Sequence, residues 1–343
     1  EETDRRFDTG YSLGCHDGET SGISLADVEL PSGEILDINV HRDTYKFSVH
    51  GRLDIPCVLC HTNISEYPHQ PIEEESLREF AVANYSACAT CHDSQYSATH
   101  DSVHSSALLA GNIEAAVCTD CHGTHNIQPA GTRATAIQQT CENCHFEIYT
   151  LYEESVHGAA LFEEGNADVP TCTDCHGVHD VEGPTDTGFH LFSPQICADC
   201  HEDEDLMGRY GISTEVFDTY VADFHGTTVV IFEELAPDQE TNKAVCIDCH
   251  GVHNIASAAN PESQTFRENL LGTCQRCHPD ATSNFPTSWM SHYSPTLEQT
   301  PLVFFVNLFY RILIPAVIGA MVLWVLMDFA KKLVARRRRY SNA

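Results

Sequence analysis

The sequence predicts a domain of coil and short α-helices organised around bound groups, followed by one C-terminal transmembrane helix. Cysteine and histidine dominate the composition, with 17 Cys and 21 His in 343 residues. Many of them recur at one fixed spacing, and from Pro301 the composition becomes strongly apolar. Because soluble chains so rich in cysteine usually lie outside the cytosol, we interpret the polar start at Glu1 as lying at or near a processed N-terminus.

The pattern Cys-x-x-Cys-His occurs eight times and uses 16 of the 17 cysteines. Two thiols at this spacing lie about one helical turn apart, so they can bond to two vinyl groups of one porphyrin while the next His coordinates the iron. This is the attachment signature of c-type haem. Zinc ribbons, thioredoxin-like sites and disulfide scaffolds are alternatives, but none requires eight copies with a His after each pair.

The motifs define the expected haem-binding residues. The thioether cysteines are Cys57, Cys60, Cys88, Cys91, Cys118, Cys121, Cys141, Cys144, Cys172, Cys175, Cys197, Cys200, Cys246, Cys249, Cys274 and Cys277. The proximal iron ligands are His61, His92, His122, His145, His176, His201, His250 and His278.

A ninth site is expected in Ser12-Leu13-Gly14-Cys15-His16, where Ser12 stands in place of the first cysteine. Cys15 would form a single thioether and His16 would be the proximal ligand. The alternative for Cys15 is a free or intermolecular thiol.

The motifs form four two-haem units near residues 50–104, 105–157, 158–225 and 226–292, preceded by the site at 12–16. The first motif of units two to four reads Cys-x-Asp-Cys-His-Gly-x-His. A separate His, mostly in a Ser-Val-His setting, follows each second motif. The site at 12–16 is grouped with the second motifs, and His50 is the histidine that follows it.

Nine proximal histidines therefore meet nine candidate distal ligands. These are His50, His69, His104, His125, His157, His179, His225, His253 and His292. Only His41, His100 and His190 remain, as surface or propionate-contacting residues. Only four Met are present, which favours His/His over His/Met ligation.

Two of these distal assignments carry further expectations. His125, like its two equivalents, lies three residues after a proximal His. On one helix both rings would point the same way, so His125 must reach a different iron. His292 is expected to serve the haem of Cys274, Cys277 and His278, which would lie nearest the membrane.

Over residues 12–292 these motifs resemble those of multihaem c-type cytochromes, which carry Cys-x-x-Cys-His-Gly-x-His and Ser-x-His-Gly repeats. The chain also resembles membrane-anchored multihaem subunits of quinone-linked electron-transfer complexes. The resemblance implies low-potential, bis-His haems and little regular secondary structure. Residues 1–300 are expected to form the multihaem domain, on the extracytoplasmic side.

Residues 301–330 are predicted to form the transmembrane helix, because a span needs about 20 apolar residues. A buried core helix is the alternative. The basic residues of 331–343 predict a cytoplasmic tail by the positive-inside rule and place the haem domain on the periplasmic side. Arg311 either snorkels to the outer interface or pairs with a partner subunit or an anionic group.

The net charge of −32 argues against nucleic acid as a partner. It indicates either a solvated surface or a docking face for basic redox proteins. We expect electron transfer along eight or nine haems, in the cytochrome c subunit of a respiratory or photosynthetic membrane complex. The expected partner is a quinone-reactive or b-type cytochrome subunit.

Two alternative functions remain open. One is a multihaem reductase or oxidase of a small nitrogen or sulfur compound, and the other is a subunit of an extracellular electron conduit. No catalytic residue is predicted, because every full motif ends in His and distal histidines are sufficient.

Overall fold

The computed structural model describes residues 8–17, 25–64, 69–129, 134–186, 188–237, 239, 242–288, 292, 294–298 and 300–341. Within these ranges the chain forms mainly short α-helices and coil. One antiparallel sheet joins β1 (Val28–Glu29) to β2 (Ile35–Leu36). The prediction of short helices with little sheet is therefore confirmed.

The helices of the first half lie between the N-terminus and the third motif pair. They are α1 (Thr9–His16), α2 (Arg42–Phe47), α3 (Val49–Arg52), η2 (Cys57–Leu59), α4 (Leu77–Asn84), η3 (Tyr85–Thr90), α5 (Asp93–Thr99), α6 (Val103–Leu109), α7 (Cys118–His122), α8 (Ala134–Glu153) and α9 (Val156–Phe162). Here η denotes a 3-10 helix.

The helices of the second half lead to the long C-terminal helix. They are α10 (Cys172–His176), α11 (Phe189–His201), α12 (Glu204–Gly208), α13 (Val216–Val221), α14 (Phe224–Leu235), α15 (Cys246–His250), α16 (Leu270–Gln275), α17 (Asn284–Ser288) and α18 (Pro301–Ser341).

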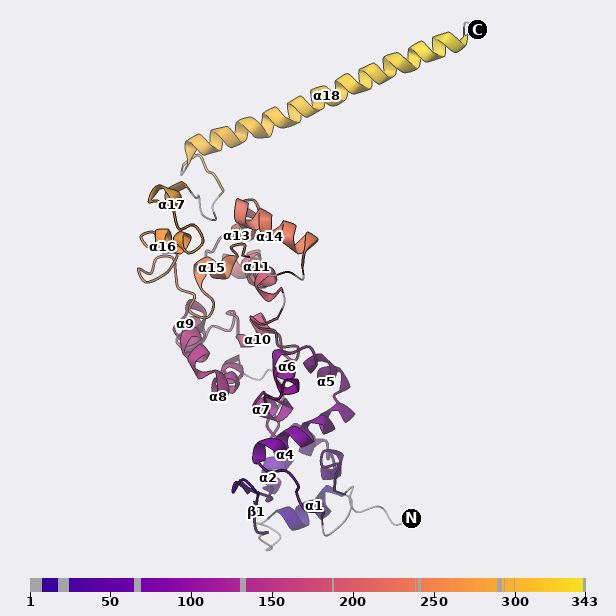
Figure 1. Cartoon of the computed structure of the whole chain (residues 1–343), viewed down its shortest axis with the longest axis vertical. Helices are drawn as coiled ribbons and strands as arrows, with labels where there is room; N and C mark the ends of the chain where they lie inside the picture. Colours follow the sequence, from indigo (N-terminus) through magenta and orange to yellow (C-terminus); the bar gives the residue numbers. More distant parts are fainter. Residues whose placement is uncertain are drawn as a thin grey trace.

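The molecule is elongated, and its elements follow one another along the long axis in nearly the order of the sequence (Figure 1). Helix α1 and strand β1 lie at one end, α7 and α10 lie in the middle, and α16 and α17 lie at the other end. Helix α18 projects from the end that holds α17. The order of the motifs in the sequence is therefore also their order in space.

The ordinary apolar core is small in the described part of the chain. One core cluster there joins Leu191, Tyr220, Val229 and Val245. A continuous cavity of about 3960 Å³ instead runs through the domain. Because a pocket for one small ligand typically has about 300–1,000 Å³, this cavity has room for several large cofactors.

The first motifs of units two to four each form a five-residue helix, α7, α10 or α15. An Asp at the third position of each helix explains where these helices begin. In α7, the Asp120 carboxylate accepts a hydrogen bond of 2.6 Å from the Val117 N–H, which satisfies a donor that a helix N-terminus leaves unpaired. Asp174 and Asp248 cap α10 and α15 in the same way.

The glycine after each of these motifs explains where the helix ends. Gly123 has a φ of 75°, a conformation that favours glycine, and the helix stops at His122. The expectation that His122 and His125 share one helix is therefore wrong. The chain turns at Gly123, and this turn frees His125 to point to another site.

The Ser-Val-His segments form a second kind of short helix. Ser48 and Ser155 are the N-caps of α3 and α9, and their hydroxyls accept hydrogen bonds from Gly51 N–H (2.9 Å) and Gly158 N–H (3.0 Å). A Cβ at Gly158 would lie 1.9 Å from the Tyr152 carbonyl oxygen, so no larger residue fits. The sequence Ser-Val-His-Gly thus fixes the His at the second position of a capped helix.

Helix α18 is the one described helix long and apolar enough to cross a membrane. Its candidate span is Pro301–Lys332, with a mean hydropathy of 2.3, and none of it is buried within the protein. A core helix would be largely buried, so the exposure of α18 favours a membrane anchor. The helix continues past residue 330, the predicted end of the span, to Ser341.

Candidate functional site

Each predicted proximal histidine faces one predicted distal histidine. The pairs are His16–His69, His61–His125, His92–His50, His122–His179, His145–His104, His176–His253, His201–His157, His250–His292 and His278–His225. Their ring centres are 5.9 Å (His176–His253) to 6.4 Å (His157–His201) apart.

This separation fits two imidazoles on opposite faces of one metal ion. Two metal–nitrogen bonds of about 2.0–2.1 Å, each extended by about 1.1 Å from nitrogen to ring centre, place the centres about 6.2 Å apart. Direct ring stacking does not require this value at every pair. The residues present therefore fit a haem iron with two histidine ligands and a flat macrocycle between them.

The electrostatics of the pairs also suit metal binding. Burial, together with the facing His201, lowers the pKa of His157 to about 4. Burial likewise lowers the pKa of His61 and His250, with their neighbouring histidines adding to the effect. These rings are therefore neutral at pH 7, which is the form that binds a metal.

The nitrogen that faces the gap is defined at two proximal histidines. Nδ1 of His176 lies 2.8 Å from the carbonyl oxygen of Glu182, and Nδ1 of His16 lies 2.8 Å from that of Ile38. A carbonyl oxygen only accepts hydrogen bonds, so Nδ1 carries the proton and Nε2 has the free lone pair. Such a carbonyl partner is the usual orienting contact of a metal-bound histidine.

Second motifs are paired with a histidine that precedes them in the sequence. His92 faces His50 and His201 faces His157, each at the start of a capped helix. His50 follows the site at 12–16 in the sequence, but its ring faces His92 and not His16.

First motifs are paired with a histidine from the next unit. His61 faces His125 and His122 faces His179, so consecutive units share ligands. This agrees with the inference that His125 reaches a different site from that of its neighbour His122, although the reason given for it was wrong.

The assignment of His292 to the Cys274 site is wrong. His292 faces His250 at 6.2 Å, while His278 faces His225 at 6.2 Å. The sequence setting of His292 resembles that of the ligands of second motifs, yet no further unit follows to supply a ligand for His250. The last histidine before α18 takes that place.

The ring planes divide the pairs into two classes. The four first-motif pairs and His16–His69 have interplanar angles of 15° to 26°. The four second-motif pairs have angles of 40° to 55°. From His61 to His278 the two classes alternate along the chain.

Thiols of successive motifs lie next to one another. Between units, the first cysteine of a second motif is hydrogen-bonded to the first cysteine of the following first motif: Cys88 with Cys118, Cys141 with Cys172, and Cys197 with Cys246. Within a unit, burial raises the pKa of Cys60, and the nearby thiols of Cys88 and Cys91 raise it further. Cys121, Cys175 and Cys249 have the same relation to the next motif. The eight full motifs thus form an unbroken row.

The cavity follows this row. Its lining includes the histidines of eight pairs, from His16 to His292, and only the His225–His278 pair lies outside it. None of the motif cysteines forms a disulfide, and neither does Cys15. Among the described residues no three His, Cys, Asp or Glu side chains are grouped to hold a metal ion, which argues against zinc ribbons.

The three histidines left over by the sequence count have other surroundings. His190 Nε2 lies 3.1 Å from Asp248 Oδ2, and His100 packs edge-on against Tyr96. His41 is the residue before α2. None of the three faces another histidine in the described part of the chain at the spacing of the nine pairs.

Three tyrosines that the sequence analysis did not single out link the two motif types. Tyr45, Tyr152 and Tyr220 each lie five residues before a distal His. Their hydroxyls donate to the carbonyls of Ile55, Pro170 and Ala244, each two residues before the first Cys of a motif. The recurring Tyr-x-x-x-x-His spacing was the signal that could have found them.

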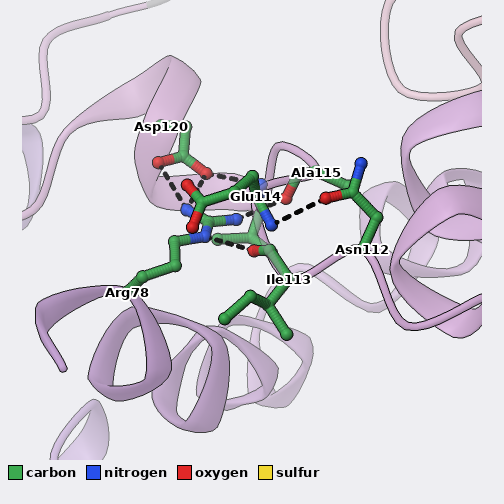
Figure 2. A network of polar contacts seen from close by, with 7 residues as sticks. Arg78, Asn112, Ile113, Glu114, Ala115 and Asp120 are labelled. Atoms are coloured by element: carbon green, nitrogen blue, oxygen red, sulfur yellow. Dashed lines mark hydrogen bonds and ion pairs between the residues drawn. The ribbon is translucent and has the colours of Figure 1, made fainter. Parts of the chain in front are cut away.

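Arg78 is another residue that the motifs did not reveal (Figure 2). From α4 its guanidinium donates to both carboxylate oxygens of Asp120, at 3.0 and 2.8 Å. It also donates to the carbonyls of Ile113 and Ala115. Since Asp120 caps α7, Arg78 links helix α4 of unit one to the start of the Cys118 motif in unit two.

Comparison with known families supports this assignment of the motifs. Residues 112–202 match the family model of cytochrome c3, and this segment contains four complete Cys-x-x-Cys-His motifs. No curated protein and no solved structure matched the chain. From its repeated attachment motifs and the cytochrome c3 match over residues 112–202, the chain is a multihaem c-type cytochrome.

Proposed function

We propose that this protein carries electrons along a row of at least eight bis-His c-type haems, between a membrane partner and a partner outside the membrane. The carrying observation is the continuity of the row. Each motif has thiols beside those of the next, from Cys57 to Cys277. Electron transfer needs such close neighbours, whereas catalysis at a single site does not.

When bound, haem supplies a one-electron iron centre whose potential depends on its axial ligands. The chain's own residues do the rest. The cysteine pairs would hold the porphyrin edges, and facing histidines such as His122 and His179 would ligate the iron. Two such ligands would leave no open iron position for a substrate. This supports electron transfer over reduction or oxidation of a small compound.

The membrane end of the row is the end beside α18. His292, nine residues before Pro301, belongs with His250, and α16 carries the Cys274 motif at the same end (Figure 1). An extended chain spans at most about 3.6 Å per residue, so the tether holds the His250 site within roughly 32 Å of the helix start. We propose that an integral quinone-reactive or b-type cytochrome subunit exchanges electrons here.

Membrane topology follows from the same helix. Basic residues after Asp328 would lie on the cytoplasmic side, and the haem domain would lie on the periplasmic side, where covalent haem attachment takes place. The net charge of −32 supports exchange with basic redox proteins at the far end, since opposite charge speeds encounter.

The test uses native membranes that contain the full-length chain. Addition of a quinol should reduce its haems, as followed by the c-type absorption bands, and a quinol-site inhibitor should block this reduction. The control is a variant in which residues 301–330 are replaced by an unrelated transmembrane helix. This variant should keep its haems and its location in the membrane. If dithionite reduced the haems of the wild-type chain but quinol did not, the proposed electron exchange with a membrane partner would be wrong.

A further inference from the structure

The N-terminal helix α1 carries a histidine that is held like a proximal ligand. The Asp8 carboxylate caps this helix by accepting from Gly10 N–H at 2.8 Å. His16 is its last residue, and its carbonyl accepts from Val40 N–H at 2.7 Å. Its Nδ1 is paired with the carbonyl of Ile38, so its Nε2 is directed away from the backbone.

The same two contacts hold a proximal histidine of a complete motif. The carbonyl of His176 accepts from Glu182 N–H at 2.7 Å, and its Nδ1 lies 2.8 Å from the Glu182 carbonyl oxygen. His16 thus has the orientation and tautomer that a complete Cys-x-x-Cys-His motif gives its histidine.

A second histidine stands opposite His16 at the spacing of an iron site. His69 lies with its ring centre 6.1 Å from that of His16, at an interplanar angle of 15°. The matching value at His61–His125 is 6.1 Å. Both rings of the His16 pair line the common cavity beside Ser12 and Cys15.

Ser12 occupies the place of a first motif cysteine. Its hydroxyl is hydrogen-bonded to the Cys57 thiol. In the following units the equivalent contact joins two cysteines, as in Cys88 with Cys118. The junction between the first two sites is therefore built like the later ones, with one sulfur replaced by oxygen.

We propose that Cys15, His16 and His69 hold a ninth haem, attached through one thioether and ligated by two histidines. This inference rests on the proposed function, because it uses the same attachment chemistry. The Cys15 S–H adds across one vinyl group: a sulfur–carbon bond forms, and the proton goes to the other vinyl carbon. No oxidant or reductant is consumed. The second vinyl group is retained, because Ser12 has no thiol to add.

The position of this site gives it a distinct role. It lies at the end of the molecule opposite α18 (Figure 1), and Cys15 is exposed. The ninth haem is therefore the last relay of the row, where electrons leave to or arrive from a partner outside the membrane.

The test is mass spectrometry of tryptic peptides from the mature holoprotein. No Lys or Arg lies between Arg6 and Arg42, so trypsin releases residues 7–42 as one peptide. This peptide should carry an added mass of about 616 Da for one haem. Residues 53–78, released at Arg52 and Arg78, contain the complete Cys57 motif and serve as the positive control.

Two variants test the single thioether. Cys15→Ser should remove the haem from peptide 7–42 and leave that of peptide 53–78 in place. Ser12→Cys should keep the mass that one haem adds to the peptide, and the pyridine haemochrome band of its haem peptide should shift to that of an ordinary c-type haem as the remaining vinyl is consumed. Peptide 7–42 without haem, beside a loaded 53–78, would overturn this inference alone. Both peptides without haem would overturn the proposed function as well.

Discussion

Replacing His125 by alanine should open the iron site of His61 and leave that of its sequence neighbour His122 closed. His125 faces His61 at 6.1 Å, while His122 faces His179 at 6.2 Å. One of nine histidine pairs is broken, so about one ninth of the iron should change from low to high spin. Electron paramagnetic resonance of the oxidised protein measures that fraction. His100→Ala is the matched control, because His100 packs against Tyr96, and it should change nothing.

Double variants identify the affected iron. When His61→Ala is already present, adding His125→Ala should produce no further high-spin iron, because the two residues serve one site. When His122→Ala is present instead, adding His125→Ala should produce one more high-spin iron. The logic holds whether a proximal variant keeps or loses its haem. If His125→Ala added a signal beside His61→Ala and none beside His122→Ala, the pairing between units would be refuted.

His292→Ala should open the iron of His250 and slow quinol-linked reduction, while a small reductant still reduces the other haems; unchanged spectra and rates would contradict this assignment. Tyr152→Phe loses the 2.6 Å hydrogen bond to the Pro170 carbonyl and should lower stability by about 1 kcal/mol, measured by thermal unfolding. Burial raises the pKa of Tyr152 to about 12, so the stabilisation by its hydroxyl is complete below pH 10 and is lost as the pH rises through 12. A stability difference between wild type and Tyr152→Phe that grew above pH 10 would contradict this. Arg78→Ala should lower the free energy of unfolding by about 1–2 kcal/mol without loss of haem. Arg78→Lys should not restore it, because only the guanidinium has separate nitrogens for Asp120 and for the carbonyls of Ile113 and Ala115. Arg209→Ala, which removes an exposed ion pair with Asp168, should be nearly neutral in the same scans.

The identities of the facing histidines could be predicted from the sequence because their chemistry follows from residue type and count. Nine proximal and nine distal histidines were identified by pattern alone, and the structure places all eighteen in facing pairs. Which histidine meets which could not be predicted in the same way. Pairing depends on the turn at Gly123 and on how consecutive units pack, and both are long-range properties.

The case of His292 shows the limit most clearly. Its position after a second motif indicates the ligand of a repeating unit, but the repeat ends there. The structure uses His292 at the His250 site, because that site lacks a following unit. The repeat pattern predicts ligands well for the inner units, whereas the last unit has no following unit to supply a histidine. The contacts of Tyr152 and Arg78 could not be predicted from the sequence either. Their partners are backbone carbonyls and a capping carboxylate, and which carbonyl lies within reach depends on the folded structure.

The two directions of pairing have a consequence for the order in which the sites are completed as the chain is made. A second motif such as that of His92 finds its partner His50 already made when it emerges. A first motif such as that of His61 must wait for His125, one whole unit later. Each new unit therefore supplies the distal histidine that the first motif of the preceding unit lacks. The histidine pairs are completed in order from the N-terminus towards α18. A chain that stopped after any of the first three units would lack the distal histidine of one site, that of the last first motif made.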